Sequence, residues 1–404
     1  RRRAKLKGLH GSVEGKSGNK LRQALRENPS LLPKMVASKH TNSAIVYGDQ
    51  FFFKIYRTPQ EGENPEVEMM KQLKRKTNFT HIPRYLGRLD YKNPYLEDTS
   101  LALLMELIPN VGRAWDMTQT SIETFFDKVL SEKEEIIEAG HLDEIDLDDL
   151  VGPFFLDMVE ILAKRTAELH IALASINDLP EFKPEPFTLL YQKSLYQAFR
   201  TYVKKSFRTI SAQEANIPEE HRDFLEATLD QADVFLEGVR RLLESGKIEA
   251  LKCRIHGNFK LDKVLFTGKD FTVINFEGEL ERSFSARRIK HSPLKDVASM
   301  LSSFHYAINK GYAQRKEFVP VDSMFLRPLL DYWYRNVSDV FIDTYTETIS
   351  GNQIIPKDRD QVNKMINMYL LEKSVQELKY FTGNEPESVL IPLKMLKKLL
   401  VLMH

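Results

Sequence analysis

A short β-hairpin is the feature that most constrains the fold of this chain. Residues 263–266 (Lys-Val-Leu-Phe) and 271–274 (Phe-Thr-Val-Ile) are rich in β-branched and aromatic side chains, and each run is too short for a stable helix. The four residues between them, 267–270, include Gly268 and Asp270, which favour a tight turn. The sequence therefore predicts two paired strands at this point.

Polar residues stand directly before and after this hairpin. His256, Gly257 and Asn258 precede it, and Asn275 follows it in the order Asn-Phe-Glu-Gly. Kinases place a catalytic base, a metal ligand five residues later and a second metal ligand beyond a hairpin in this way. The corresponding positions here are Asn258, Lys263 and Asn275, whereas a working enzyme has Asp at the first and the last. The spacing predicts the loop arrangement of a phosphotransferase active site, but without the carboxylates that such a site uses.

A second hairpin is predicted nearer the N-terminus, from the apolar runs 44–47 and 51–56 and the turn at Gly48. Lys54 lies in its second strand. Two interpretations of this residue stay open. A lone lysine in a strand is commonly a solvated residue on the outer face, but a strand lysine also holds the nucleotide phosphates in kinases.

A helix is predicted to begin near Asn64 and Pro65, because proline suits the first turn and acidic side chains follow closely. Glu68 is the candidate for the helix carboxylate that pairs with Lys54 in a kinase. The alternative is that Glu66 and Glu68 merely complement the positive end of the helix dipole.

Residues 101–108 form an apolar run that predicts a buried strand, ended by Pro109. In a kinase this place belongs to the hinge, where backbone groups meet the adenine, so Met105 and Leu107 are candidates for cofactor binding. No Gly-rich loop precedes the strand lysine, since the equivalent turn at 40–43 reads His-Thr-Asn-Ser. The sequence thereby argues against a protein kinase and against a P-loop enzyme.

Beyond Gly112 the pattern is mainly helical. The predicted fold class is α+β, with a small β-rich lobe at 41–110 and a larger helical lobe at 111–404 that contains the hairpin stretch 254–279. Residues 1–40 are expected to be the end of a further N-terminal domain. Because the chain opens without Met, we also expect it to be a fragment.

Three features of the helical part have ordinary structural explanations. His170 follows an apolar-faced helical run and is predicted to be a packed or capping residue. Ser292 suits a helix N-cap with Asp296 at the capping-box position, so a structural role for Asp296 is at least as well supported as a functional one. The acidic patch at 143–149 lacks the Gly and the terminal Glu of a calcium loop, which favours a solvated insertion.

Charge, cysteine content and hydropathy narrow the function further. The formal net charge of +1 gives no argument for nucleic acid or an anionic membrane as a partner. Cys253 is the one cysteine, which excludes an internal disulfide and fits a reducing compartment, so we expect a cytoplasmic protein. No apolar run approaches the roughly 18 residues of a membrane span.

Several stretches resemble one family, the bacterial maltokinases, including those fused to trehalose synthase. The similarity runs over most of the chain and includes Val-Tyr-Gly-Asp at 46–49, Gly-Glu-Asn-Pro at 62–65, Arg-Thr-Ala-Glu-Leu-His at 165–170, Leu-Tyr-Gln-Lys-Ser-Leu-Tyr at 190–196, Phe-Glu-Gly-Glu at 276–279 and Ser-Pro-Leu-Lys-Asp-Val-Ala at 292–298. The resemblance implies a two-lobed fold like that of eukaryotic kinases, usually preceded by a cap domain, of which residues 1–40 would be the end. It further implies that ATP and Mg²⁺ phosphorylate maltose to maltose 1-phosphate, with trehalose synthase as a fused or associated partner.

The resemblance also assigns roles to individual positions. It places Asn258 at the base position after His256, and Asn275 at the metal loop. The nucleotide side then comprises Lys54, Glu68, Met105, Leu107 and Lys263, and the sugar side comprises Arg288, Lys373, Glu377 and Tyr380. Departures from the family pattern on the sugar side are Ala286, Gln376, Phe381 and Glu385.

The substitutions in the catalytic positions have a physical consequence. Asn replaces Asp at 258 and 275, and Lys replaces Gln at 263, so each change makes the site more positive by one charge. An ammonium group beside the metal position repels a divalent ion, by about 4 kcal/mol per pair of unit charges at 4 Å and an effective dielectric near 20. Metal binding is therefore expected to be weak, and the alternative role for Lys263 is a direct contact with the phosphates.

Three functions follow as hypotheses. The first is a degenerate maltokinase, a pseudokinase with a structural or regulatory role beside trehalose synthase, because an amide has no accessible basic form to accept the sugar proton. The second is an active ATP-dependent sugar kinase with a base-independent mechanism, in which Lys54 and Lys263 neutralise the phosphates. The third is a binding module that senses a glucan or a nucleotide without chemistry.

Overall fold

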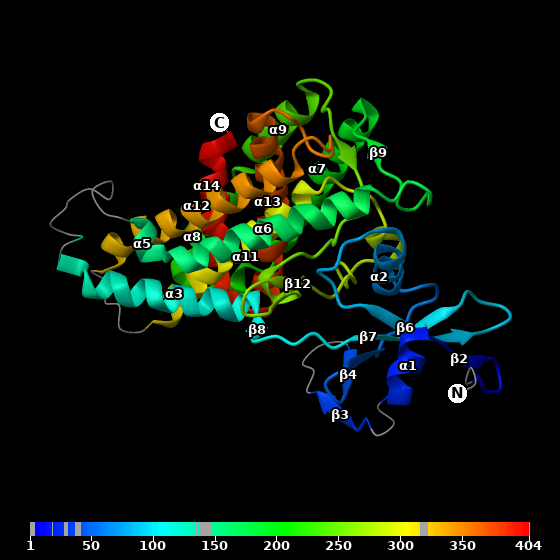
Figure 1. The fold of residues 1–404 in the computed structure, drawn as a ribbon. Helices are drawn as coiled ribbons and strands as arrows, with labels where there is room; N and C mark the ends of the chain where they lie inside the picture. The colour runs from blue at the N-terminus through cyan, green and yellow to red at the C-terminus, as the bar shows by residue number, and fades with distance from the viewer. Residues whose placement is uncertain are drawn as a thin grey trace.

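The computed structural model describes residues 5–17, 19–27, 31–36, 42–134, 136, 147–315 and 322–403. A sheet-containing lobe built from the N-terminal part of the chain lies against a larger helical lobe, and the hairpin strand β12 (Phe271–Val273) lies where they meet (Figure 1). The predicted division into a small β-rich lobe and a large helical lobe is confirmed.

One antiparallel sheet forms the small lobe, with the strand order β1-β2-β6-β7-β5-β4-β3. Its strands are β1 (Lys5–Lys7), β2 (Ser12–Ser17), β3 (Pro33–Val36), β4 (Asn42–Tyr47), β5 (Phe51–Tyr56), β6 (Tyr85–Lys92) and β7 (Thr99–Glu106). The predicted hairpin is β4 and β5, in a register that sets Ala44 opposite Lys54. His40 and Thr41, from the turn discussed above, lie outside the described residues.

The first 36 residues are not a separate layer within the described ranges. β2 pairs with β6 and β3 pairs with β4, so this segment extends both edges of the small-lobe sheet. Helix α1 (Asn19–Glu27) connects the two edges. A domain boundary at residue 40 stays a prediction, but the segment before it shares its sheet with the residues after it.

Helix α2 (Pro65–Lys76) begins as its sequence predicts. The side chain of Asn64 accepts a hydrogen bond from the backbone N–H of Glu66 at 2.9 Å, and Pro65 occupies the first turn, where no N–H donor is needed. Val67, Met70 and Leu73 recur at helical spacing and are buried. This apolar face fixes the helix against the rest of the molecule and leaves its acidic residues to face the lobe boundary.

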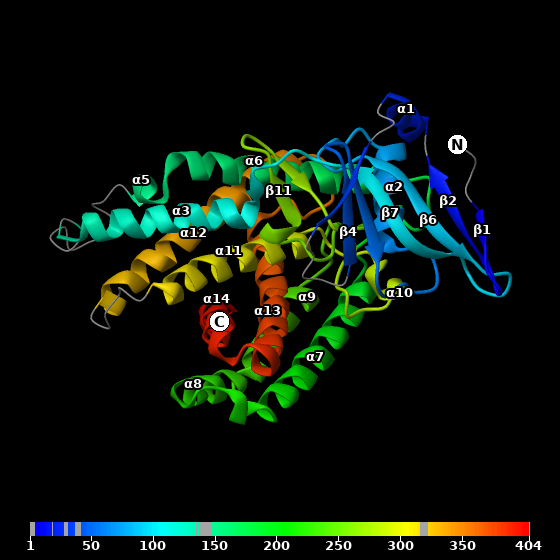
Figure 2. The same cartoon turned by 90° about the horizontal axis from the view of Figure 1, so that it is seen from below.

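The large lobe is helical. Its helices are α3 (Ala114–Ser131), α5 (Leu147–Val151), α6 (Pro153–Ala174), α7 (Leu189–Ser211), α8 (Glu219–Leu229), α9 (Ala232–Glu244), α10 (Phe284–Arg287), α11 (Leu294–Gln314), α12 (Asp322–Ile349), α13 (Arg359–Asn384) and α14 (Leu390–Met403). Figure 2 shows α3, α6, α11 and α12 running side by side, with α13 crossing them. Most of the acidic patch, residues 143–146, lies outside the described residues.

The predicted catalytic hairpin is confirmed as β11 (Val264–Phe266) and β12, with Val264 opposite Val273. A third short strand, β8 (Gly112–Arg113), pairs with β11 directly after the connection between the lobes. A separate two-stranded sheet, β9 (Glu185–Pro186) with β10 (Leu251–Lys252), leads into the segment before the hairpin. None of the helices in the described part of the chain combines the length and apolarity that a membrane span requires.

Candidate functional site at the lobe boundary

Asp296 holds the loop that precedes the hairpin. Its carboxylate is 1 % exposed and accepts the backbone N–H of His256 at 2.7 Å and of Gly257 at 2.9 Å. Burial opposes the charge, but the contacts with His170 and His256 and the backbone N–H group outweigh it and lower the pKa of Asp296. The predicted capping box is wrong, since Pro293 is the N-cap of α11 and the carboxylate turns toward the loop instead.

His170 supports this carboxylate from the other side. Its Nε2 lies 3.2 Å from Asp296 Oδ2 and its Nδ1 lies 2.9 Å from the hydroxyl of Tyr345, with the ring fully buried. The prediction of a packed residue is confirmed. The histidine also orients a group that sets the position of the catalytic-type loop.

His256 ties the loop to the segment after the hairpin. Its Nε2 lies 2.9 Å from the carbonyl oxygen of Ile274, and its Nδ1 accepts the backbone N–H of Asn258 at 3.3 Å. Burial lowers the pKa of the imidazole, which favours the neutral ring that these two bonds require. Both ring nitrogens are thus engaged within the protein, and His256 acts here by positioning Asn258 rather than by reaching a substrate.

Lys263 is paired with its neighbour. The ammonium group lies 2.6 Å from Asp262 Oδ2, and the pKa of Asp262 is lowered because this pairing outweighs the effect of burial. The sequence-based charge count left Asp262 out. The positive charge expected beside the metal position is therefore largely neutralised within the 3-10 turn Leu261–Lys263.

Lys54 lies at the centre of a buried polar cluster. The side chain is on the inner side of β5 with the residue 5 % exposed, and its ammonium group donates to Glu66 Oε2 at 2.8 Å, Glu277 Oε2 at 2.8 Å and Asn275 Oδ1 at 3.1 Å. Burial opposes its charge, but the two carboxylates outweigh burial and raise the pKa of Lys54. Of the two interpretations, the solvated outer-face lysine is wrong.

The carboxylate that pairs with Lys54 is Glu66, and the prediction of Glu68 is wrong. Two residues apart on a helix, side chains point to nearly opposite sides of the axis, so only one of them can face β5. Glu66 is fully buried, and it also accepts a hydrogen bond from the hydroxyl of Tyr56 at 3.0 Å. Burial raises the pKa of Glu66, and among the described residues its Oε1 has no hydrogen-bond partner.

Glu277 is the residue that sequence reasoning missed. Besides Lys54, it accepts the side-chain amide of Asn42 at 3.1 Å, which joins the segment after β12 to strand β4 of the small lobe. Asn275, two residues earlier, has a positive φ of 64°, a conformation that Asn tolerates better than most residues. The acidic residue two positions after the metal-loop Asn275 was the available signal.

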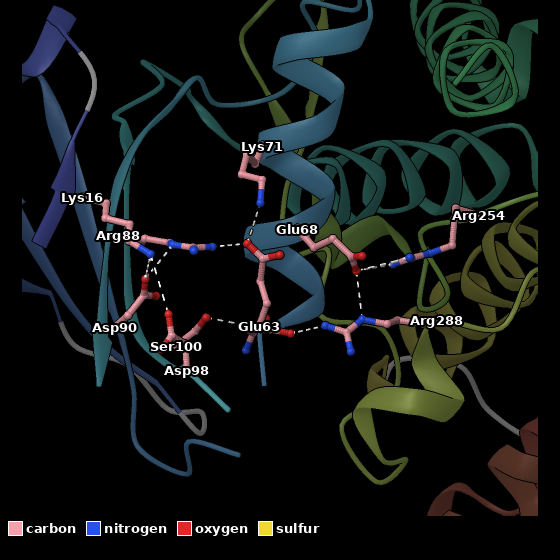
Figure 3. Close-up of polar contacts among 11 residues, drawn as sticks. Lys16, Glu63, Glu68, Lys71, Arg88, Asp90, Asp98, Ser100, Arg254 and Arg288 are labelled. Atoms are coloured by element: carbon pink, nitrogen blue, oxygen red, sulfur yellow. Dashed lines mark hydrogen bonds and ion pairs between the residues drawn. The ribbon is translucent and has the colours of Figure 1, made fainter. Parts of the chain in front are cut away.

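Glu68 belongs to a different network, which connects α2 with the large lobe (Figure 3). Its Oε2 accepts two bonds from the guanidinium group of Arg254 at 3.2 Å each and one from Arg288 Nε at 3.0 Å. Arg254 is 1 % exposed and packs over the ring of Phe182 at 4.7 Å. Arg288 also donates to the carbonyl oxygen of Glu63, so it links α2 to the large lobe, and its predicted role on the sugar side stays a prediction.

The hinge positions are engaged in the sheet. Met105 is opposite Phe52 on one side and Tyr85 on the other, and the backbone N–H of Leu107 donates to the carbonyl oxygen of Gln50 at 2.9 Å. The predicted contacts with adenine stay predictions. Leu107 can donate its backbone N–H to an adenine only if its bond to Gln50 is broken.

A small cavity adjoins Gly257 on the large-lobe side. Lys373 lines it, and its ammonium group donates to Gln376 Oε1 at 3.0 Å. Glu377 lies nearby and accepts the hydroxyl of Ser302 at 2.9 Å, whereas Tyr380 is 47 % exposed. The cavity volume of about 20 Å³ is room for roughly one water molecule, so the walls have to move before a sugar enters.

The residues present do not fit a kinase-type magnesium site. The base and metal positions are Asn258, Lys263 and Asn275, and the ammonium group of Lys54 already takes the oxygen of Asn275. In the described part of the chain, no group of three or more His, Cys, Asp or Glu residues is placed to hold a metal ion. Magnesium prefers carboxylate and water oxygens in octahedral geometry. The ammonium group of Lys54 therefore fits this cluster of side chains better than a magnesium ion does.

Comparison with known proteins identifies the fold. No family model matches the chain. A glucosamine kinase in complex with glucosamine, ADP and inorganic phosphate matches 98 % of this chain and 92 % of its own, at a TM-score of 0.69 and 16 % identity. Crystal form B of glucosamine kinase covers 98 % and 93 % at a TM-score of 0.67 and 17 % identity. A choline kinase from Cryptosporidium parvum Iowa II covers 94 % of both chains at 0.49 and 12 %. The two glucosamine kinase structures confirm the predicted kinase-like, two-lobed fold, and likenesses at these identities establish the fold alone.

Proposed function

We propose that this chain is a sugar-kinase-like domain that has lost ordinary magnesium-dependent phosphoryl transfer and retains a place for a nucleotide. The observation that carries the proposal is the cluster around Lys54. Its ammonium group is held by Glu66 and Glu277, and it also takes the side-chain oxygen of Asn275, the position that binds a metal ion in a kinase. The ammonium group of Lys54 thus supplies part of the positive charge that a metal ion supplies in a kinase.

The loss of transfer follows from Asn258. An amide can donate a hydrogen bond to a sugar hydroxyl, but it has no accessible basic form to take the proton. General-base catalysis contributes typically about 10²–10⁴-fold in rate. A site without the base and without the metal-loop carboxylate is therefore expected to bind a nucleotide or a sugar but to transfer the phosphoryl group slowly or not at all.

The resemblance to maltokinases makes maltose the first sugar to test and trehalose synthase the first protein partner. The matches at 46–49, 165–170 and 292–298 support this assignment. In this role the domain serves assembly or regulation of the partner enzyme.

An active sugar kinase with a base-independent mechanism is the second candidate. The observation in its favour is that Lys54 stays charged in the buried cluster, available to neutralise a phosphate once Glu277 releases it. Phosphoryl transfer depends largely on positioning, so the base is not strictly required.

A coupled assay with maltose, ATP and Mg²⁺ separates the two candidates. Turnover at ordinary kinase rates of about 1–100 s⁻¹ would refute the first. A thermal-shift titration with ATP then tests nucleotide binding, and we expect a similar stabilisation with Mg²⁺ and with EDTA.

Two lysine variants complete this test. Lys54→Met should abolish the ATP-dependent shift, whereas Lys34→Met, on the exposed strand β3, should retain it. A shift that requires Mg²⁺ would contradict the idea of an internal cation.

A further inference from the structure

The cavity beside Gly257 has charged walls whose acidic members are all engaged. Glu279 is paired with Arg282, and Glu372 accepts two bonds from Lys295 at 2.8 and 2.9 Å. The remaining carboxylate, Asp296, accepts the backbone of the catalytic-type loop. No lining carboxylate is therefore left over for a cationic ligand.

Lys373 is the lining cation that remains. Within the ranges that the structure describes, no carboxylate oxygen lies within 4.0 Å of its ammonium group, and its bond is to the neutral amide of Gln376. Burial lowers the pKa of Lys373; the more distant charges of Glu377 and Glu279 oppose this shift, and Lys260 and Lys295 add to it. A partly buried ammonium group without a directly paired carboxylate is costly for the folded protein, and a bound anion would reduce that cost.

Lys260 adds a second positive charge near Lys373, although it does not line the cavity itself. It follows Asn258 by two positions in the catalytic-type loop. It forms no ion pair with any of the described carboxylates, and its charge acts on both Lys373 and Glu377. Two like charges near one cavity disfavour each other, so both gain from a shared anion.

Other groups lining the cavity suit hydroxyl groups. Tyr202, Ser299 and Tyr369 carry hydroxyls, and Gln376 carries an amide. These side chains donate and accept hydrogen bonds without charge. The wall thus combines a cationic corner with a neutral polar surface.

We propose that this cavity binds a small polyhydroxylated molecule that carries an oxyanion, a carboxylate or a phosphate, on Lys373 with Lys260 nearby. The proposal rests on the proposed function, in that it names the ligand class of the kinase-like site. It differs from the neutral maltose that the family resemblance implies.

Arg282 controls the space available. The cavity and a second one of about 20 Å³ share Gly257, Glu279, Arg282 and Lys295 as lining residues. Arg282 is 39 % exposed at its side chain, so it can rotate into solvent at little cost and join the two spaces. Ligand entry is therefore accompanied by a change in its contacts with Glu279 and Glu372.

Calorimetric titration of the full chain tests the proposal, with EDTA present and no nucleotide. The probes are glucose 6-phosphate, glucuronate, glucose, glucosamine and maltose. At least one of the two anions should bind about tenfold or more tightly than glucose, because charge-assisted hydrogen bonds are roughly twice as strong as neutral ones. Its affinity should fall with added salt. Preference for glucose 6-phosphate identifies a phosphate site and preference for glucuronate a carboxylate site.

Variants decide which residue is responsible. Lys373→Met should lose the preference for the anion, and Lys260→Gln should weaken it by a smaller factor. Lys364→Met is the matched control, since Lys364 lies on the same helix, α13, and is paired with Asp360 at the surface. Thermal melts establish that each variant is folded.

Three results would overturn the proposal: neutral sugars or glucosamine bind as tightly as the anions, Lys373→Met binds unchanged, or neither anion binds to the folded chain. These outcomes are separate from the fate of the proposed function. Turnover with maltose and Mg-ATP refutes the pseudokinase assignment and leaves the anion site standing, because the titrations contain neither nucleotide nor metal.

Discussion

Replacement of Glu68 by Gln should destabilise the protein far more than an ordinary surface substitution. The Glu68 carboxylate is 11 % exposed and is the acceptor for both Arg254 and Arg288. Arg254 is 1 % exposed, and burial lowers the pKa of its guanidinium group even though Glu68 acts against that shift. Breaking a buried pair by removing one partner costs about 3–5 kcal/mol, because the remaining charge stays out of water. We expect a loss at the lower end of that range, since Gln still offers one oxygen acceptor.

Urea unfolding followed by circular dichroism gives the free energy of unfolding for each variant. The control is Glu237→Gln, because Glu237 and its partner Arg240 are both about half exposed, and it should leave the free energy of unfolding nearly unchanged. The double variant Glu68→Gln with Arg254→Met should be more stable than Glu68→Gln alone, since no buried charge is left unpaired. A cost below about 1 kcal/mol for Glu68→Gln, or simple additivity in the double variant, would refute the assignment of this network as a buried connection between the lobes.

Three further predictions concern buried groups of the large lobe. Asp296→Asn should lower the free energy of unfolding by about 1–3 kcal/mol at neutral pH, because the backbone N–H groups of the loop lose a charged acceptor. Since the pKa of Asp296 is lowered in the folded protein, this stability is present above the ordinary Asp pKa and is lost as the pH falls below about 4. The free energy of unfolding measured in urea should therefore decline less steeply with acid in the variant than in the parent protein. His305 is 3 % exposed, and burial lowers its pKa well below the ordinary value. Its contribution to stability should therefore be complete above about pH 6.5 and decrease as the pH falls, by up to about 1.4 kcal/mol per pH unit. His305→Phe should flatten that slope, and an unchanged slope would contradict the conclusion that His305 is buried in its neutral form. Burial raises the pKa of Cys253 to about 12, so its thiol should resist Ellman's reagent at pH 8 in the folded protein and react fully in urea, and rapid reaction of the folded chain would show that the thiol is accessible.

Local sequence patterns were sufficient for the elements that frame the site. Alternating and continuous apolar runs with Gly-containing turns predicted β4, β5, β11 and β12, because strand and turn preferences act over a few residues. Pro65 after Asn64 predicted the start of α2 for the same reason. The layout of His256 to Asn275 then predicted the kinase-like fold, which the structural comparisons confirm.

Pairings between distant side chains could not be predicted in this way. Glu66 and Glu68 are both acidic and both in the first turn of α2, and only the rotation of α2 against β5 decides that Glu66 meets Lys54. Asp296 has the spacing of a capping box, but its carboxylate is drawn to unpaired backbone N–H groups 39 and 40 residues earlier. The pairing of Arg288 with Glu68, which is 220 residues away in the sequence, likewise had no local signal.

The sequence by itself determined which charges are present at the catalytic positions, since Asn258 and Asn275 are neutral in any fold. Only the tertiary structure decided how the remaining charges are compensated. Lys263 is neutralised by Asp262, Lys54 is shared by two carboxylates, and Lys373 bonds to the amide of Gln376 without a direct ion pair to any described carboxylate. Charge compensation depends on distances of a few ångströms in a medium of low dielectric. Such distances are set by the packing of α2, β5 and α13 around the lobe boundary and not by the order of residues along the chain.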